Sequence, residues 1–257
     1  MHKSFVVLLS LAVFLYAARS HAHEDVLPYG LDGKIATGGH DDVLGTNNIT
    51  QRVFGYDFGE DPSDPFIIGD PGFNNGAFAI GLFPNDGLLP PNFTLGLNVL
   101  TNLSFWDGAG AVSFAPSAAG VDLGLTRGSN TVHISGAGLT GITPTIGSTV
   151  AAGRLHVHTT STLNFTDGTN PLAPNAPDGV YLFGLELTLT GSGLAKSDPI
   201  YFVFNNGVSE ETHDTAIEWA QNNLVVPEPS TWVLLSLGLL LAPLVARKRH
   251  ASTGKAN

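Results

Sequence analysis

The sequence predicts an all-β protein: a single antiparallel β-sandwich or jelly-roll domain with one short helix late in the domain. Three observations predict this fold. Alternating polar and apolar side chains recur along the chain, and glycine (31) and proline (16) are frequent between the alternating segments. The hydrophobic fraction of 43% is too high for a disordered chain. About eight to ten short strands with no helical stretch between them are typical of a sandwich.

The expected strands follow one another at short intervals. They cover residues 49–58, 77–83, 93–100, 111–114, 121–125, 131–135, 155–165, 181–190 and 200–204. In 181–190 the odd positions are apolar or aromatic, whereas Glu186, Thr188 and Thr190 are expected to face outward. The segment 200–204 is apolar on both faces, as in a central strand.

The segment 155–165 shows the clearest alternation. One face carries Leu155, Val157, Leu163 and Phe165, and the other carries His156, His158, Thr160, Thr162 and Asn164. The late helix is expected to begin after Ser209, which can cap it, with Glu210 and Glu211 at its positive N-terminal end. It should end near Asn222.

Both ends of the chain are predicted to be targeting segments. At the start, His2 and Lys3 precede an apolar run over 5–18, and Ser20-His21-Ala22 supplies small residues at a cleavage point. This pattern is typical of a secretory signal peptide over residues 1–22. At the other end, Pro227-Glu228-Pro229 precedes a 17-residue uncharged run over 230–246, which is followed by Arg247-Lys248-Arg249. As a helix this run spans roughly 25 Å, the short end of a membrane-crossing length.

The order of these C-terminal features resembles the PEP-CTERM sorting signal of Gram-negative bacteria. The resemblance implies cutting near Pro227-Glu228-Pro229 by an exosortase, a membrane-embedded protease. The basic cluster Arg247-Lys248-Arg249 would stay on the cytoplasmic side and fix the topology. The expected organisation is a signal peptide (1–22), an exported β-sandwich domain (23–226), a sorting signal with a transmembrane helix (227–250) and a short cytoplasmic tail (251–257).

The expected partners and location follow from these segments. The partners are the secretion machinery, signal peptidase, the exosortase, the inner membrane before processing, and exopolysaccharide. The product is expected at the outer surface or in the extracellular matrix.

The composition excludes several classes of function. Residues 23–226 hold five basic and 21 acidic residues, a formal charge of −16. Such a surface is unsuited to nucleic acid. The absence of cysteine excludes thiol nucleophiles, iron–sulfur clusters and thiolate zinc sites. The chain also lacks Gly-x-Ser-x-Gly, His-Glu-x-x-His and Walker motifs.

His156 and His158 are the best candidates for a metal site. Their side chains would leave one strand face roughly 6.5–7 Å apart at the base, and imidazole suits zinc or copper. The third ligand is expected to be His40 or His23, while His213 with Asp214 and Glu210 is a further source. The alternative is an ordinary polar strand face exposed to solvent.

Two weaker metal sites can also be drawn from the sequence. His23 would be the first residue after signal cleavage, and a free N-terminal histidine can hold copper as in the histidine brace of lytic polysaccharide monooxygenases. A turn-rich loop gathers Asp57, Glu60, Asp61 and Asp64, which suits calcium, although a solvated acidic loop is the simpler interpretation.

These features predict an exported surface or matrix protein with a non-enzymatic structural or binding role. The alternative is an exported metal-binding protein, or an enzyme acting on extracellular polysaccharide.

Overall fold

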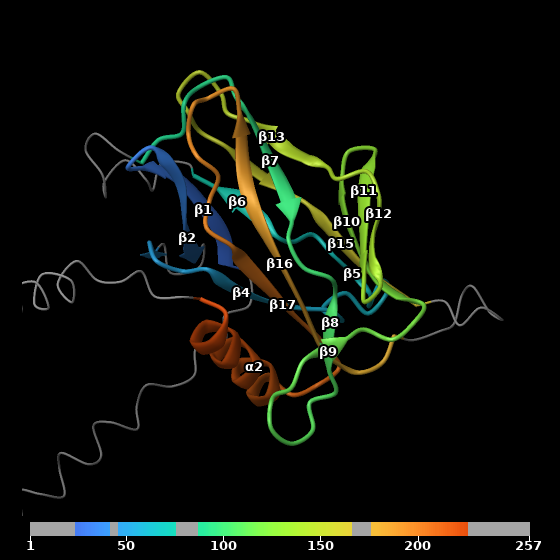
Figure 1. Ribbon diagram of the computed structural model, residues 1–257. Coiled ribbons are helices and arrows are strands. Elements are labelled where there is room, and N and C mark those ends of the chain that lie inside the picture. Colours follow the sequence, from blue (N-terminus) through green and yellow to red (C-terminus); the bar gives the residue numbers. More distant parts are fainter. Residues whose placement is uncertain (1–23, 42–45, 76–86, 166–175, 226–257) are drawn as a thin grey trace, which may run out of the picture.

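The computed structural model describes residues 24–41, 46–75, 87–165 and 176–225 (Figure 1). In these ranges it shows seventeen strands and one helix, which confirms the all-β class and the single late helix. The strands form three sheets instead of the two of a simple sandwich.

The first sheet carries the predicted histidine pair at its edge. Its order is β14 (His156–His158), β6 (Gly72–Asn74), β1 (Glu24–Leu31), β2 (Lys34–Asp41) and β3 (Thr46–Asn48). Strands β1 and β2 form a hairpin that the sequence interpretation missed, with a turn at Asp32-Gly33 where both residues have positive φ. The short strand β6 lies between the hairpin and β14, pairing parallel to β1 and antiparallel to β14.

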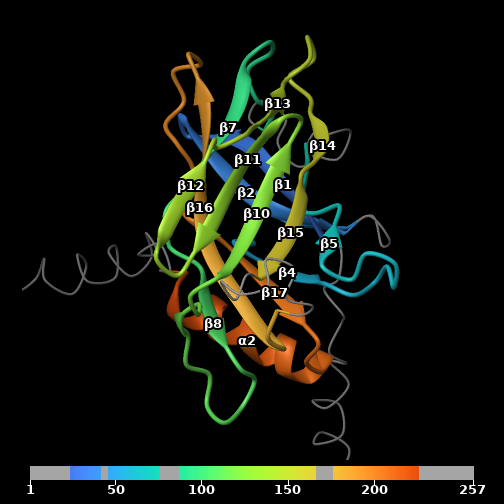
Figure 2. The ribbon, with the colours of Figure 1, turned by 90° about the vertical axis from the view of Figure 1, so that its right-hand side faces the viewer.

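The second and third sheets complete the fold. The second has the order β12 (Gly138–Gly141), β11 (Asn130–Ser135), β10 (Val121–Arg127), β15 (Thr160–Phe165) and β5 (Ile67–Ile68), which Figure 2 shows side by side. The third has the order β13 (Thr145–Ser148), β7 (Thr94–Val99), β16 (Gly179–Thr190), β17 (Ile200–Asn206) and β4 (Val53–Asp57). Strand β8 (Ser104–Trp106) pairs with β16, and β9 (Ala115–Pro116) pairs with β8.

One hydrophobic core is shared by the three sheets. Val26 and Ile35 enter it from the first sheet, Leu123 from the second, and Phe183 and Phe202 from the third. Aromatic rings of β4, β16 and β17, together with Phe58 just after β4, pack against one another with centroids 5.4–6.0 Å apart. Because the three sheets bury apolar faces against the same core, they form one packed unit.

Several strand predictions need correction. The segment 155–165 is not one strand: β14 and β15 belong to different sheets, and the chain changes sheet at Thr159, whose N–H and hydroxyl both donate to the Pro71 carbonyl. The expected strand at 111–114 is absent, and that at 77–83 lies outside the described residues. The sheets are not purely antiparallel either, since β17 pairs parallel to β4.

Glu186 also differs from the expectation that it faces outward. It is 5% exposed, and its carboxylate accepts hydrogen bonds from Lys196 Nζ and Asn98 Nδ2, each at 2.9 Å. Period-two alternation cannot reveal this burial, because the covering side chains come from other segments.

Helix α2 (Glu210–Asn223) matches the sequence prediction closely. Ser209 caps it, with its side chain accepting from the Thr212 N–H, and Glu210 and Glu211 occupy the first turn. The helix buries its apolar stripe, Ala216, Ile217 and Ala220, against the third sheet, where it contacts β4 and β17. Figure 1 shows α2 beside these two strands.

Candidate functional site

Strand β14 presents the two histidines of the predicted pair on one face. Side chains alternate along a strand, so His156 and His158 share a face while Val157 lies on the other. Their Nε2 atoms are 3.2 Å apart. The two side chains are 56% and 46% exposed, so both rings can be reached from solvent.

Asp25 of β1 is the third member of this group, and sequence reasoning missed it. Its side chain is 3% exposed, with Oδ2 3.5 Å from His156 Nε2 and Oδ1 4.0 Å from His158 Nε2. One ligand atom from each residue lies within 4.8 Å of the others. Burying a carboxylate is costly unless a positive charge or hydrogen bonds compensate it. Asp25, His156 and His158 are called the His–Asp cluster below.

Gly72 of β6 leaves the space that the cluster occupies. It pairs directly with His158, and β6 separates β14 from β1. A Cβ atom on Gly72 would collide with Asp25 Oδ1 and would come within 2.8 Å of His158 Cε1. The absence of a side chain at this position is therefore a condition for the close approach of Asp25 and His158.

The segment next to Gly72 fixes the tautomer of His158. His158 Nδ1 lies 3.1 Å from the Gly69 carbonyl oxygen and 3.4 Å from Asp70 Oδ1. Since a carbonyl oxygen only accepts hydrogen bonds, Nδ1 carries the hydrogen, and in the neutral ring Nε2 keeps its lone pair. That lone pair belongs to the nitrogen that faces His156 and Asp25.

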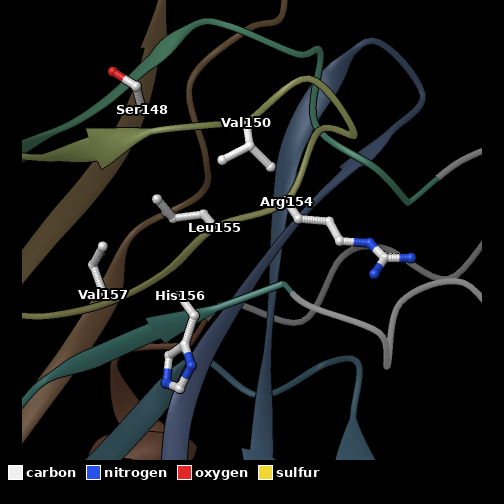
Figure 3. Close-up of a pocket in the computed structure, with 6 residues that line it drawn as sticks. All are labelled: Ser148, Val150, Arg154, Leu155, His156 and Val157. Atoms are coloured by element: carbon white, nitrogen blue, oxygen red, sulfur yellow. The ribbon is translucent and has the colours of Figure 1, made fainter.

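A shallow hollow of about 280 Å³ adjoins the cluster on the His156 side. Figure 3 shows Val150, Leu155 and Val157 beside one another, while the His156 ring projects to the other side of the strand. Arg154 and Ser148 complete its lining. The hollow is mainly apolar, and His156 lies at its margin.

A second group of titratable side chains lies where α2 meets the third sheet. His213 is 3% exposed, its Nδ1 lies 3.3 Å from Asp57 Oδ1, and its Nε2 donates to the Val203 carbonyl at 3.0 Å. Glu210 is the third residue of this group. With both ring nitrogens engaged, the arrangement suits a charged imidazolium that joins helix to sheet better than it suits a metal ligand.

The groups around His213 raise its pKa by more than burial lowers it. Burial alone lowers the pKa of His213, but the hydrogen bond and charge of Asp57 raise it, and the Val203 carbonyl adds to the rise. The net result is a pKa above the ordinary histidine value. The pKa of Glu210 is also raised, chiefly by the charge of Asp57 and then by burial.

Comparison with protein families decides the interpretation of the C-terminal segment. The family described as the PEP-CTERM protein-sorting motif matches residues 225–249. The chain carries a PEP-CTERM sorting signal. The match includes Pro227-Glu228-Pro229 and Arg247-Lys248-Arg249, and such a signal implies export and processing by an exosortase at the membrane. No curated protein and no solved structure matches the chain.

The other predicted site residues are distributed over the fold. His40 lies on β2, 1% exposed and directly opposite Asp25, but its ring nitrogens are not part of the His–Asp cluster. His23 and the sorting-signal residues 227–249 lie outside the described residues. Within the described ranges, none of the helices has the length and hydrophobicity needed to cross a membrane.

The carboxylates of the predicted calcium loop have separate surroundings. Asp57 accepts from Asn205 Nδ2 at 2.8 Å and lies beside His213, whereas Asp61 accepts from the Ser63 N–H and hydroxyl within its own turn. Glu60 and Asp64 complete the predicted set, and in the described part of the chain the four do not come together as one group of ligand atoms. Calcium binding here stays a prediction from sequence.

Proposed function

We propose that this chain is an exported surface or extracellular-matrix protein whose β domain has a non-enzymatic structural or binding role. The single observation that carries the proposal is the PEP-CTERM sorting signal at residues 225–249. The predicted signal peptide at 1–22 supplies the entry to the same route, so residues 23–226 would be delivered across the inner membrane.

The properties of the domain agree with this role. Three sheets share one core without any cysteine, so the domain needs no disulfide to hold it together outside the cell. Its formal charge of −16 keeps copies apart at high local concentration and favours the binding of cations over that of anionic polymers. Both properties suit a protein that accumulates at a surface or in a matrix.

The test is fractionation of the native host with an antibody against the β domain. We expect the protein in the outer-surface or matrix fraction, with a mass that lacks residues 1–22 and part or all of the segment after Pro229. A cytoplasmic marker protein is the control for leakage. Recovery of the uncut chain with that marker would contradict the proposal.

Metal binding is a second candidate function, and the His–Asp cluster is the observation that favours it. An enzyme acting on extracellular polysaccharide would need such a centre, or a pair of carboxylates, at a substrate cleft. Metal-dependent cleavage of host exopolysaccharide by the exported protein, lost when His156 and His158 are both replaced by alanine, would favour the enzyme over a structural role.

A further inference from the structure

We propose that the His–Asp cluster is a Zn²⁺ site in which Asp25, His156 and His158 are the ligands and the fourth position is open to solvent. This inference goes beyond the sorting signal, because it rests only on residues 24–165. It also revises the ligand set expected from sequence, since Asp25 takes the place of His40 or His23.

The distances between the ligand atoms match a tetrahedral centre. With zinc bonds of about 2.0–2.1 Å, two ligand atoms of a tetrahedral site lie about 3.3–3.4 Å apart. The structure has 3.2 Å between the two Nε2 atoms, 3.5 Å from His156 Nε2 to Asp25 Oδ2, and 4.0 Å from His158 Nε2 to Asp25 Oδ1. Since the two longer distances end on different oxygens of Asp25, a small rotation of the carboxylate would let one oxygen face both nitrogens.

The surroundings hold His158 in the tautomer that binds a metal through Nε2. Its Nδ1–H donates to the Gly69 carbonyl, with Asp70 close by, which is the usual outer contact of a metal-bound histidine. The hydrogen bonds from Thr159 to Pro71 and from Ser161 to the Asp70 carbonyl attach this segment to the second sheet. The ring of His158 therefore points its lone pair at the cluster before any metal arrives.

The ligand types select the metal class. Two imidazoles and one carboxylate suit zinc and other divalent transition metals, whereas calcium and magnesium prefer sites made of oxygen atoms alone. Between the two histidines, a metal would replace the hydrogen that now joins their Nε2 atoms. Zn²⁺ would also bring a positive charge next to the nearly buried Asp25 carboxylate.

The location of the ligands gives the site a structural consequence. Asp25 lies in the N-terminal hairpin and the histidines lie in β14, with β6 between them. Zinc would join these distant parts of the chain across the sheet. Both histidines are exposed, so the open position faces solvent and a ligand from outside the domain can reach it.

The experiment uses the full chain purified in mild detergent, stripped with a chelator and titrated with ZnCl₂ by calorimetry. We expect one Zn²⁺ per chain. His156→Ala, His158→Ala and Asp25→Asn should each weaken binding by at least about 100-fold, since even outer contacts of a metal centre contribute 10- to 100-fold. His133→Ala is the matched control, because His133 is also half-exposed and lies 2.7 Å from a carboxylate, Asp122.

If Asp25→Asn fails to fold, His156→Ala still decides the test. The His156 side chain is 56% exposed, so His156→Ala should retain the circular dichroism of the wild type. Equal zinc affinity in this folded variant and in the wild type would overturn the proposal, as would no zinc binding by the wild type. Failure of the sorting proposal would leave this result unchanged.

Cobalt tests the geometry independently. Co²⁺ in place of zinc should give the intense visible absorption of a four-coordinate centre, and His133→Ala should retain it. The weak absorption of a six-coordinate ion would overturn the tetrahedral assignment.

Discussion

At the scale of single residues, the His–Asp cluster depends on a position that has no side chain. Gly72 of β6 is the direct pairing partner of His158 on the neighbouring strand β14, and the Asp25 carboxylate occupies the space where a Gly72 Cβ would lie. Gly69, three residues earlier, is exposed and has open space at the same atom, and its carbonyl accepts the His158 Nδ1–H. Gly72 is therefore needed because it leaves space for Asp25, whereas Gly69 contributes only its backbone carbonyl.

We predict that Gly72→Ala lowers the free energy of unfolding by about 1–3 kcal/mol, because the added methyl group overfills a buried site. The same variant should bind zinc more weakly, since Asp25 must move away. Gly69→Ala should change stability by less than about 0.5 kcal/mol. Urea denaturation measures both variants. Equal stability of the two would show that the Asp25 side chain adapts without cost.

At the scale of elements, helix α2 is attached to the third sheet by packing and by one buried histidine. Ala216, Ile217 and Ala220 supply the apolar contact. His213 supplies the polar contact, through Val203 on β17 and Asp57 on β4. The charged groups that face its ring are Asp57 from the sheet and Glu210 from the helix itself.

We predict that this contact makes stability depend on pH. The pKa of His213 is raised in the folded state, so the imidazolium stabilises the fold fully below the unfolded value of about 6.5. This contribution is lost as the pH rises from there through the folded pKa. Urea midpoints at pH values from about 5.5 to 9 should fall over that window in the wild type. The fall should be smaller in His213→Gln, and equal slopes would assign the pH dependence to other groups.

At the scale of the whole molecule, folding and delivery rely on different parts of the chain. The three sheets and α2 lie in the described residues between 24 and 225, whereas the sorting signal occupies residues 225–249. Delivery should therefore respond to changes in the signal that leave the β domain untouched. The signal combines a short proline-bounded segment, an apolar run and a basic cluster.

We predict that replacing Pro227, Glu228 and Pro229 together by alanine blocks processing. Proline on both sides disfavours helix in this segment, so we expect it to stay outside the helix predicted for 230–246 and open to a protease, whereas alanines would let that helix extend through it. Immunoblots of membrane and outer fractions should show the uncut precursor in the membrane. Lys255→Ala, beyond the basic cluster, is the control. Normal processing of the triple variant would indicate that the tail is only an anchor.

The sequence alone determined the features that depend on neighbouring residues. The placement of His156 and His158 on one face follows from the two-residue period of a strand, and the start of α2 follows from Ser209 and the two glutamates. The sorting signal was also readable, because an exosortase recognises a linear segment. None of these features needs a partner from elsewhere in the fold.

Only the tertiary structure decided which distant groups meet these residues. Asp25 reaches the histidines because β6 joins β1 and β14 into one sheet and Gly72 of β6 leaves space for the carboxylate. The 155–165 segment divides between two sheets because Thr159 bonds to Pro71. His40 shares a sheet with the cluster but lies one strand beyond Asp25. Strand pairing joins segments that are far apart in sequence, and the local alternation that identifies a strand carries no information on its neighbour.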